Sequence, residues 1–454
     1  MRIINQPTIK PAAESISAAG NRARSASPFK GTLLFLVMAS VGVFARPDFV
    51  SGQVASQEPP ARLMEYFAEA LENSPALAVY QTRIEAGNQR ERQAGSLPDP
   101  VINLGYFLNP DMETQVLGRF SVSAMQMFPW FGSLGAARDE RRFLTDAEKQ
   151  QYKNSALDLF RDLHLAWLDI AEIQTEAELT RKEIDLLDNL KSQIQTRFET
   201  GRASQVDLLY VELEQERLAV RIKNLESRLP ALNVRFNSLM GREGDAEVKN
   251  SGFAGRELVA DRAGIAELAN RRSPEIMSLE AGYASLESGI DRNRRMGMPE
   301  FGLGLEVMGR DYGSMTMMNM NEGYFAMATV RLPLWRGKYD GRRDEYRALQ
   351  RGLQLEIDSE RLQIEQNVSR LINSYEEAGR EITLVEERII PRIERMYRLV
   401  LESYASGSAD FNELISLRRE LLAQQIAHAG LRFEQERALS EIEREAAEHI
   451  RLVD

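Results

Sequence analysis

The stretch FETGRAS at residues 198–204 returns later in the chain as YASGSAD at residues 404–410. Three further pairs of short stretches, each containing a proline, match in the same order. They are NSP 73–75 with RSP 272–274, LPD 97–99 with MPE 298–300, and FPWFG 128–132 with LPLWRG 332–337. The offset between matched residues drifts by only a few positions, so the chain contains two copies of one domain-sized unit rather than many small repeats.

The first 55 residues predict a secretory signal peptide followed by a disordered leader. Basic residues precede the apolar run GTLLFLVMASVGVFA at 31–45, which is too short for a comfortable membrane-spanning helix. Small residues follow, with candidate cleavage sites near Ala45 and Ala55; an uncleaved anchor is the alternative. We assign residues 1–55 to this leader, 56–256 to the first structural repeat and 257–454 to the second.

The composition excludes several classes of function. The chain has 454 residues and a net charge of -11, so a nucleic-acid partner is not expected. It has no cysteine, which excludes disulfides, thiol catalysis and lipid attachment to an N-terminal cysteine. No nucleotide-binding loop, metal-binding histidine pair or nucleophile motif is present. We therefore expect neither an enzyme nor a cofactor.

Each repeat contains two stretches with the alternation of a β-strand. Residues 101–108 and 118–128 form the first pair, and residues 301–308 and 324–332 form the second. One apolar and one polar face over about ten residues is typical of strands that face lipid. Open strand edges cannot face lipid, and a closed barrel needs roughly eight strands or more. Four strands per chain therefore predict a barrel shared by several chains.

Long stretches almost without proline follow the strands in both repeats. Residues 134–198 would form a helix of about 95 Å at 1.5 Å per residue. Residues 339–404 repeat the pattern, with Pro391 as the interruption. Apolar residues recur at mixed three- and four-residue spacing, which is typical of coiled-coil packing. The predicted fold class is mainly α, with a small β part and an internal duplication.

A glycine turn ends each long helix. The glycine suits the left-handed conformation that follows a helix, the next residues can cap the following helix, and an acidic residue then suits its dipole. These residues are Gly201, Ser204 and Asp207 in the first repeat, and Gly407, Asp410 and Glu413 in the second. Helix capping explains them completely; a functional role is the alternative.

With these features, the chain resembles TolC-type outer-membrane efflux factors over residues 60–450. The resemblance rests on the duplicated plan, the proline-bounded strand pairs, the very long helices and the glycine turns with their acidic residues. It implies a homotrimer in which four strands per chain close a twelve-stranded β-barrel in the lipid of the cell outer membrane. The coiled-coil helices would form an α-barrel that extends into the periplasm.

The resemblance also implies partners and roles for the turns. The helix tips would dock onto a periplasmic adaptor protein that links the channel to an inner-membrane pump of RND type. The docking residues would be Gly201, Arg202, Ser204, Gly407, Ser408 and Asp410. The acidic lining of the family's periplasmic gate falls here on Asp207 and Glu413, and a tyrosine of the closed gate matches Tyr404. Ala409 stands where the family has a gate arginine.

Methionine is concentrated in one part of the second repeat. Eight of the 17 methionines lie between Met296 and Met327. Four of these cluster in one segment between strands: Met315, Met317, Met318 and Met320. Thioethers are soft ligands suited to Cu(I) and Ag(I), whereas the structural alternative is a flexible apolar loop. The resemblance adds a heavy-metal subgroup that exports copper and silver, or cobalt, zinc and cadmium.

The expected function is a passive exit duct of a tripartite efflux system. It would carry metal ions or other small toxic molecules from the periplasm to the exterior. An exported coiled-coil structural protein, or an adaptor without a channel, is the alternative. An adaptor would need a lipoyl-like β domain rich in glycine turns, and residues 240–272 contain no such pattern.

Overall fold

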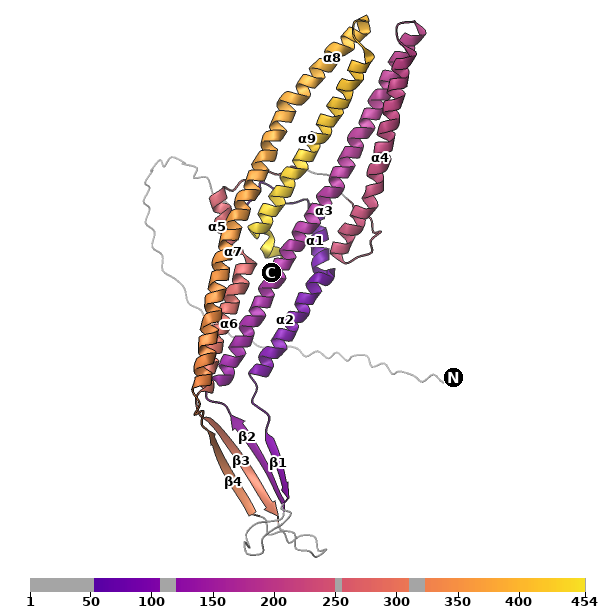
Figure 1. The fold of residues 1–454 in the computed structure, drawn as a ribbon. Coiled ribbons are helices and arrows are strands. Elements are labelled where there is room, and N and C mark those ends of the chain that lie inside the picture. Colours follow the sequence, from indigo (N-terminus) through magenta and orange to yellow (C-terminus); the bar gives the residue numbers. More distant parts are fainter. Residues whose placement is uncertain (1–52, 107–119, 250–254, 310–322, 454) are drawn as a thin grey trace, which may run out of the picture. The chain divides into compact units, whose positions relative to one another are not determined.

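The computed structural model describes residues 53–106, 120–249, 255–309 and 323–453 (Figure 1). One order of elements occurs twice: two short helices, two strands, then a long helical stretch and a returning helix. In the first half these are α1 (Ala61–Asn73), α2 (Pro75–Ala94), β1 (Val101–Tyr106), β2 (Phe120–Phe128), α3 (Ser133–Glu199) and α4 (Gln205–Met240). In the second half they are α5 (Arg262–Arg272), α6 (Pro274–Met296), β3 (Glu300–Gly309), β4 (Gly323–Arg331), α7 (Gly337–Leu384), η1 (Val385–Ile389), α8 (Ile390–Ser406), α9 (Phe411–Glu445) and the 3-10 turn η2 (Glu448–Leu452).

The leader expected at residues 1–55 lies almost wholly outside the described residues. At its end, Val54 and Ala55 are buried, and Ala55 forms an antiparallel bridge with Leu258. The Val54 N–H donates to the Glu448 carboxylate at 3.0 Å. Contacts with the helical body therefore begin before Ser56.

Helix α3 is continuous over 67 residues, as its lack of proline predicts. It follows Gly132 (φ 77°) and ends before Gly201 (φ 70°), and both glycines adopt the left-handed conformation that side chains disfavour. Midway along it, Phe160 and Trp167 are buried in a core shared with α1 and α4. Packing of this kind, rather than helix propensity, stabilises most of a long helix.

The second long stretch is interrupted one turn earlier than the proline itself. Helix α7 ends at Leu384, η1 is a single π-helical turn, and α8 starts just before Pro391. Proline has no N–H to donate, and its ring clashes with the carbonyl four residues before it. The wider turn, in which the Ile390 N–H donates to the Val385 carbonyl, accommodates the ring without breaking the rod.

The four strands form one antiparallel sheet in the order β1-β2-β3-β4. Strand β2 of the first half pairs with β3 of the second, so the sheet joins the two halves. Across it, Leu104 lies opposite Val122, Val122 opposite Val307, and Val307 opposite Tyr324. Directly paired residues point to the same side of a sheet, so these four side chains share one face.

The turn that joins α3 to α4 and the turn that joins α8 to α9 lie at the opposite end of the helices from the strands (Figure 1). One apolar cluster there takes side chains from α3, α4, α8 and α9, and so joins both helical hairpins. Its fully buried members include Leu187, Ile194, Val211, Phe411 and Leu414. The two turns are therefore held as one packed unit at this end of the helices.

A buried charged cluster joins the segment between the two halves to α9. The Arg256 guanidinium contacts the Glu436 carboxylate at 2.6 Å and the Glu443 carboxylate at 2.5 Å, and all three side chains are at most 3% exposed. Burial raises the pKa of Glu436, and Arg256 only partly offsets this. At Glu443 burial acts in the same direction, but His449 and Arg256 together lower the pKa to about 2. The neighbouring His164 is buried, and burial lowers its pKa to about 3.

Replacing Arg256 with Met should destabilise the helical body strongly. The substitution leaves two buried carboxylates without their cation, a loss that costs about 3–5 kcal/mol when one partner of a buried pair is removed. We expect a clearly lower melting temperature of the detergent-extracted protein by far-ultraviolet circular dichroism. The matched control is Arg380→Met, because Arg380 is 69% exposed and its pair with Glu376 is a surface pair. Equal melting temperatures for the two variants would contradict the assigned role of Arg256.

Candidate functional site: strand face and helix tips

One face of the sheet is apolar and exposed. The large side chains that the register places on it are Ile102, Leu104, Tyr106, Val122, Phe128, Phe301, Leu303, Leu305, Tyr324 and Val330. Leu104 is 78% exposed, Leu305 68% and Tyr324 72%. Contiguous exposed apolar surface on this scale marks a region that lipid or another protein covers. The alternation expected from the sequence is confirmed in the described part of all four strands.

The sheet also has two open edges. Strands β1 and β4 are its outer members, and each pairs with one neighbour among the described residues. The outward N–H and C=O groups of an edge strand are free to pair with another chain. In a hydrocarbon environment such groups must be paired. The open edges therefore need a further strand on either side, and the apolar face needs lipid or another protein to cover it.

The opposite face carries mainly small and polar side chains and methionines, with Val101 and Phe325 as exceptions. Asn103 donates to the Ser123 hydroxyl at 3.3 Å, and Glu300 forms an ion pair with Arg331 at 2.8 Å. Ser123 and Gly302 are buried, whereas their chain neighbours on the apolar face, Val122, Phe301 and Leu303, are exposed. The two faces thus differ in chemistry as the strand alternation predicts.

The two helix turns have the caps that the sequence predicts. Ser204 and Asp207 form a reciprocal capping box: the Ser204 hydroxyl accepts from the Val206 N–H at 3.1 Å, and Asp207 accepts from the Ser204 N–H at 3.1 Å. In the second turn, Asp410 accepts from the Asn412 N–H at 3.2 Å. Gly407 is left-handed, with φ 79°. The turns are thus rigid helix ends that present short loops.

Tyr404 connects the two turns. Its hydroxyl donates to the Asp207 carboxylate at 2.9 Å, so two of the residues that the resemblance assigns to a gate are in contact. Burial, with Asp207 adding to it, raises the pKa of Tyr404 to about 12. The phenol is therefore neutral at physiological pH and remains a donor to the carboxylate.

Arg197 reinforces this contact, and the sequence did not point to it. Its guanidinium lies 5.1 Å from the centre of the Tyr404 ring and donates to the Ala405 carbonyl at 2.8 Å. An arginine on α3 thus caps the C-terminal end of α8, where the helix dipole favours a cation. Arg197 lies on α3, so this contact joins the two helical hairpins.

The remaining predicted tip residues stay separate. Glu413 is exposed, and within the described chain its carboxylate makes no hydrogen bond or ion pair. Arg202 is exposed as well, while the Ser408 hydroxyl donates to the Ser403 carbonyl at 3.0 Å. Met315, Met317, Met318 and Met320 lie outside the described residues.

Two ion pairs tie the hairpins together below the tips. Arg418 and Arg419 are adjacent on α9; Arg418 pairs with Glu183 on α3, and Arg419 pairs with Glu214 on α4 at 2.7 Å. Burial raises the pKa of Glu183, although Arg418 opposes the shift. The sequence shows these charges but not that adjacent arginines reach two different helices.

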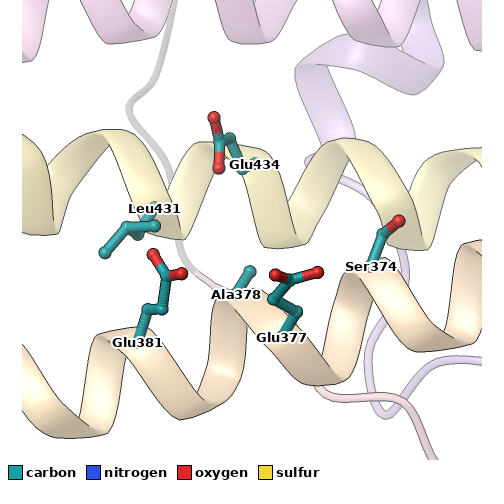
Figure 2. A pocket seen from close by; sticks show the side chains of 6 residues that line it. All are labelled: Ser374, Glu377, Ala378, Glu381, Leu431 and Glu434. Atoms are coloured by element: carbon teal, nitrogen blue, oxygen red, sulfur yellow. The ribbon is translucent and has the colours of Figure 1, made fainter.

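A shallow depression between α7 and α9 is acidic (Figure 2). It has a volume of about 330 Å³ and is lined by Ser374, Glu377, Ala378, Glu381, Leu431 and Glu434. The three glutamates are exposed, so this is a solvated acidic surface rather than an enclosed site. Neither these glutamates nor any other group of His, Asp or Glu in the described ranges is arranged to hold a metal ion. Within those ranges no helix is both long enough and apolar enough to cross a bilayer.

The family model named outer membrane efflux protein matches residues 67–241, from α1 to the end of α4. The chain has the fold of outer-membrane efflux channels. The outer-membrane channel OprN is similar with a TM-score of 0.68 and 14% identity, over 85% of this chain and 90% of that chain. CusC is similar with a TM-score of 0.71 and 14% identity, over 85% and 92%. VceC of Vibrio cholerae is similar with a TM-score of 0.66 and 14% identity, over 84% and 96%.

No curated protein sequence matches the chain. The structural likeness therefore concerns the fold. It bears out the expected mainly helical fold with a four-stranded antiparallel sheet.

Replacing Tyr404 with Phe should loosen the contact between the two turns. The variant keeps the ring and its contact with Arg197 but removes the hydrogen bond to Asp207, worth about 1 kcal/mol. We expect amide hydrogen exchange in residues 198–210 and 401–413 to become about fivefold faster. Tyr80→Phe, a hydroxyl loss on α2, serves as the control. Unchanged exchange at both turns would show that the hydrogen bond does not hold them together.

Proposed function

We propose that the chain is one subunit of a passive exit channel in the outer membrane. The observation that carries the proposal is the exposed apolar sheet face together with two open strand edges. Lipid would cover the face, and strands of neighbouring copies would pair the edges. Three copies would contribute twelve strands to one barrel, a number within the range that closed outer-membrane barrels use.

The helices would continue the channel into the periplasm. In this proposal the α3–α4 and α8–α9 hairpins of three copies form a tapering tunnel, and Asp207, Tyr404 and Glu413 lie at its gate. Tyr404 and Asp207 are already in contact within one chain, which supports a closed arrangement. Opening would be a population shift between two packings of the same helices.

The partners would be a periplasmic adaptor and an inner-membrane pump of RND type. The exposed turn residues Gly201, Arg202, Ser204, Gly407, Ser408 and Asp410 would be the adaptor's docking points. The pump would supply energy, so the channel itself would need few specific contacts with its cargo. The cargo would be metal ions or other small toxic molecules, and the methionine-rich segment favours metal ions of the copper and silver class.

The mass of the detergent-extracted protein tests the shared barrel. We expect the outer-membrane fraction to contain a particle of three chains that migrates differently on a gel before and after heating, because a closed barrel resists detergent. Removal of strand β4 should abolish the particle. A monomer recovered from the soluble periplasm would overturn the proposal and favour an exported coiled-coil protein.

Neutralising the gate carboxylates should change conduction. The double variant Asp207→Asn, Glu413→Gln keeps the capping geometry but removes two negative charges per chain. In planar bilayers we expect higher conductance and about tenfold weaker block by trivalent cations, because rings of carboxylates attract cations. The control neutralises two carboxylates away from the turns, Glu377→Gln with Glu434→Gln. Unchanged conductance and block in the gate variant would reject this role.

A further inference from the structure

Three of the four methionines on the polar face of the sheet lie close together, and the fourth, Met308, lies further along β3. Met125 and Met127 lie on β2 and Met327 lies on β4, all on the side opposite the apolar face. Two glycines of β3, Gly302 and Gly304, separate them. These three methionines are distinct from the four of the segment between β3 and β4.

The strand register places the methionines around an open patch of backbone. Met125 lies opposite Gly304, and Gly304 lies opposite Met327, so the two methionines flank a residue without a side chain. Strands lie about 4.8 Å apart, so these two backbones are about 10 Å apart. Two extended thioether side chains can span that distance. A larger residue at position 304 would fill the space between them.

The sulfur atoms of Met125 and Met127 on β2 lie over this patch. The Met127 sulfur is 2.6 Å from the position that a Cβ at Gly302 would occupy, so it lies directly over that glycine. The Thr329 hydroxyl donates to the Met125 sulfur at 3.7 Å, and Thr329 is the strand partner of Gly302. The sulfurs of Met125 and Met127, two residues apart on β2, therefore both lie beside the Gly302–Thr329 pair.

Ordinary core packing does not account for this grouping. The three methionines are partly exposed, and none belongs to the buried apolar clusters of the described chain. Their neighbours on this face include Gly302, Gly304 and Thr329, with Val101 opposite Met125 and Phe325 beside Met327 as the apolar ones. A flexible thioether on a polar surface offers a soft, polarisable donor instead of apolar volume.

We propose that Met125, Met127 and Met327 form a contact site for soft monovalent cations, Cu(I) or Ag(I). Thioether sulfur selects such ions over hard cations, and neutral ligands hold them without a charge partner. The proposal rests on the proposed function in one respect: in the shared barrel this face lines the lumen, and three copies present three such sites. A conducting path needs contacts that are favourable but readily released, which a few thioethers provide.

Silver binding to the purified, detergent-extracted protein tests the site. The probe is Ag(I) as its nitrate, titrated in chloride-free buffer and followed by calorimetry and by X-ray absorption at the silver edge. The test variant is Met125→Leu, Met127→Leu, Met327→Leu, because leucine nearly conserves volume while removing sulfur. A second variant replaces Met315, Met317, Met318 and Met320 with Leu. Met396→Leu, on the exposed side of α8, is the matched control.

We expect silver with sulfur neighbours in the wild type, the control and the variant of residues 315–320. Added to the variant of residues 315–320, the triple substitution should weaken Ag(I) binding about tenfold or more and remove the sulfur signal, because hydrocarbon replaces the remaining soft donors. Unchanged affinity and sulfur coordination after this addition would overturn the site. So would complete loss of binding in the variant of residues 315–320.

The particle mass and the bilayer conductance of the same samples separate this inference from the channel. A trimer that conducts but in which the added triple substitution leaves silver binding unchanged would refute the thioether site and leave the channel standing. A monomer without conductance that loses silver binding after this addition would refute the channel and leave the thioether site standing.

Discussion

The unpaired backbone at the outer edges of β1 and β4 is the constraint on which the rest of the structure depends. A row of free N–H and C=O groups beside an exposed apolar face is stable neither in water nor in hydrocarbon as it stands. Side-chain chemistry cannot correct it, because the groups belong to the main chain. Only further strands can. The internal duplication meets part of this need, since β2 and β3 pair across the two halves and halve the number of edges.

The helices carry a related problem over a much greater length. A helix as long as α3 has too small an apolar stripe to be stable by itself, so both halves must pack along one another. Different polar contacts join the two halves at different positions along the helices. Arg256 and its two glutamates lie at the level of the linker, the Arg418 and Arg419 pairs lie nearer the tips, and Tyr404 meets Asp207 at the turns. Polar contacts between apolar clusters fix the register of helices that could otherwise slide.

Much of this was legible in the sequence because it depends on local rules. The bounds of α3 follow from a proline-free stretch between two glycines, and the strand faces follow from a period of two. The structure confirms the capping residues Ser204 and Asp410 in their positions. Three features could not be read in this way. The role of Arg197 requires knowing that α3 and α8 are neighbours, the partners of Arg418 and Arg419 lie on other helices, and the π turn lies before the proline that causes it. The metal assignment to Met315, Met317, Met318 and Met320 and the heavy-metal subgroup both remain predictions.

The π turn η1 also determines which side chains of α8 face the neighbouring helices. Each residue advances an α-helix by about 100° around its axis, and a π turn holds one residue more than the α pattern would. Helix α8 is therefore rotated relative to a straight continuation of α7. Tyr404 packs among residues of α3, α4 and α9 because of that single additional residue. The direction in which Tyr404 points toward Asp207 thus depends on η1, some fifteen residues earlier in the chain, which contacts neither residue.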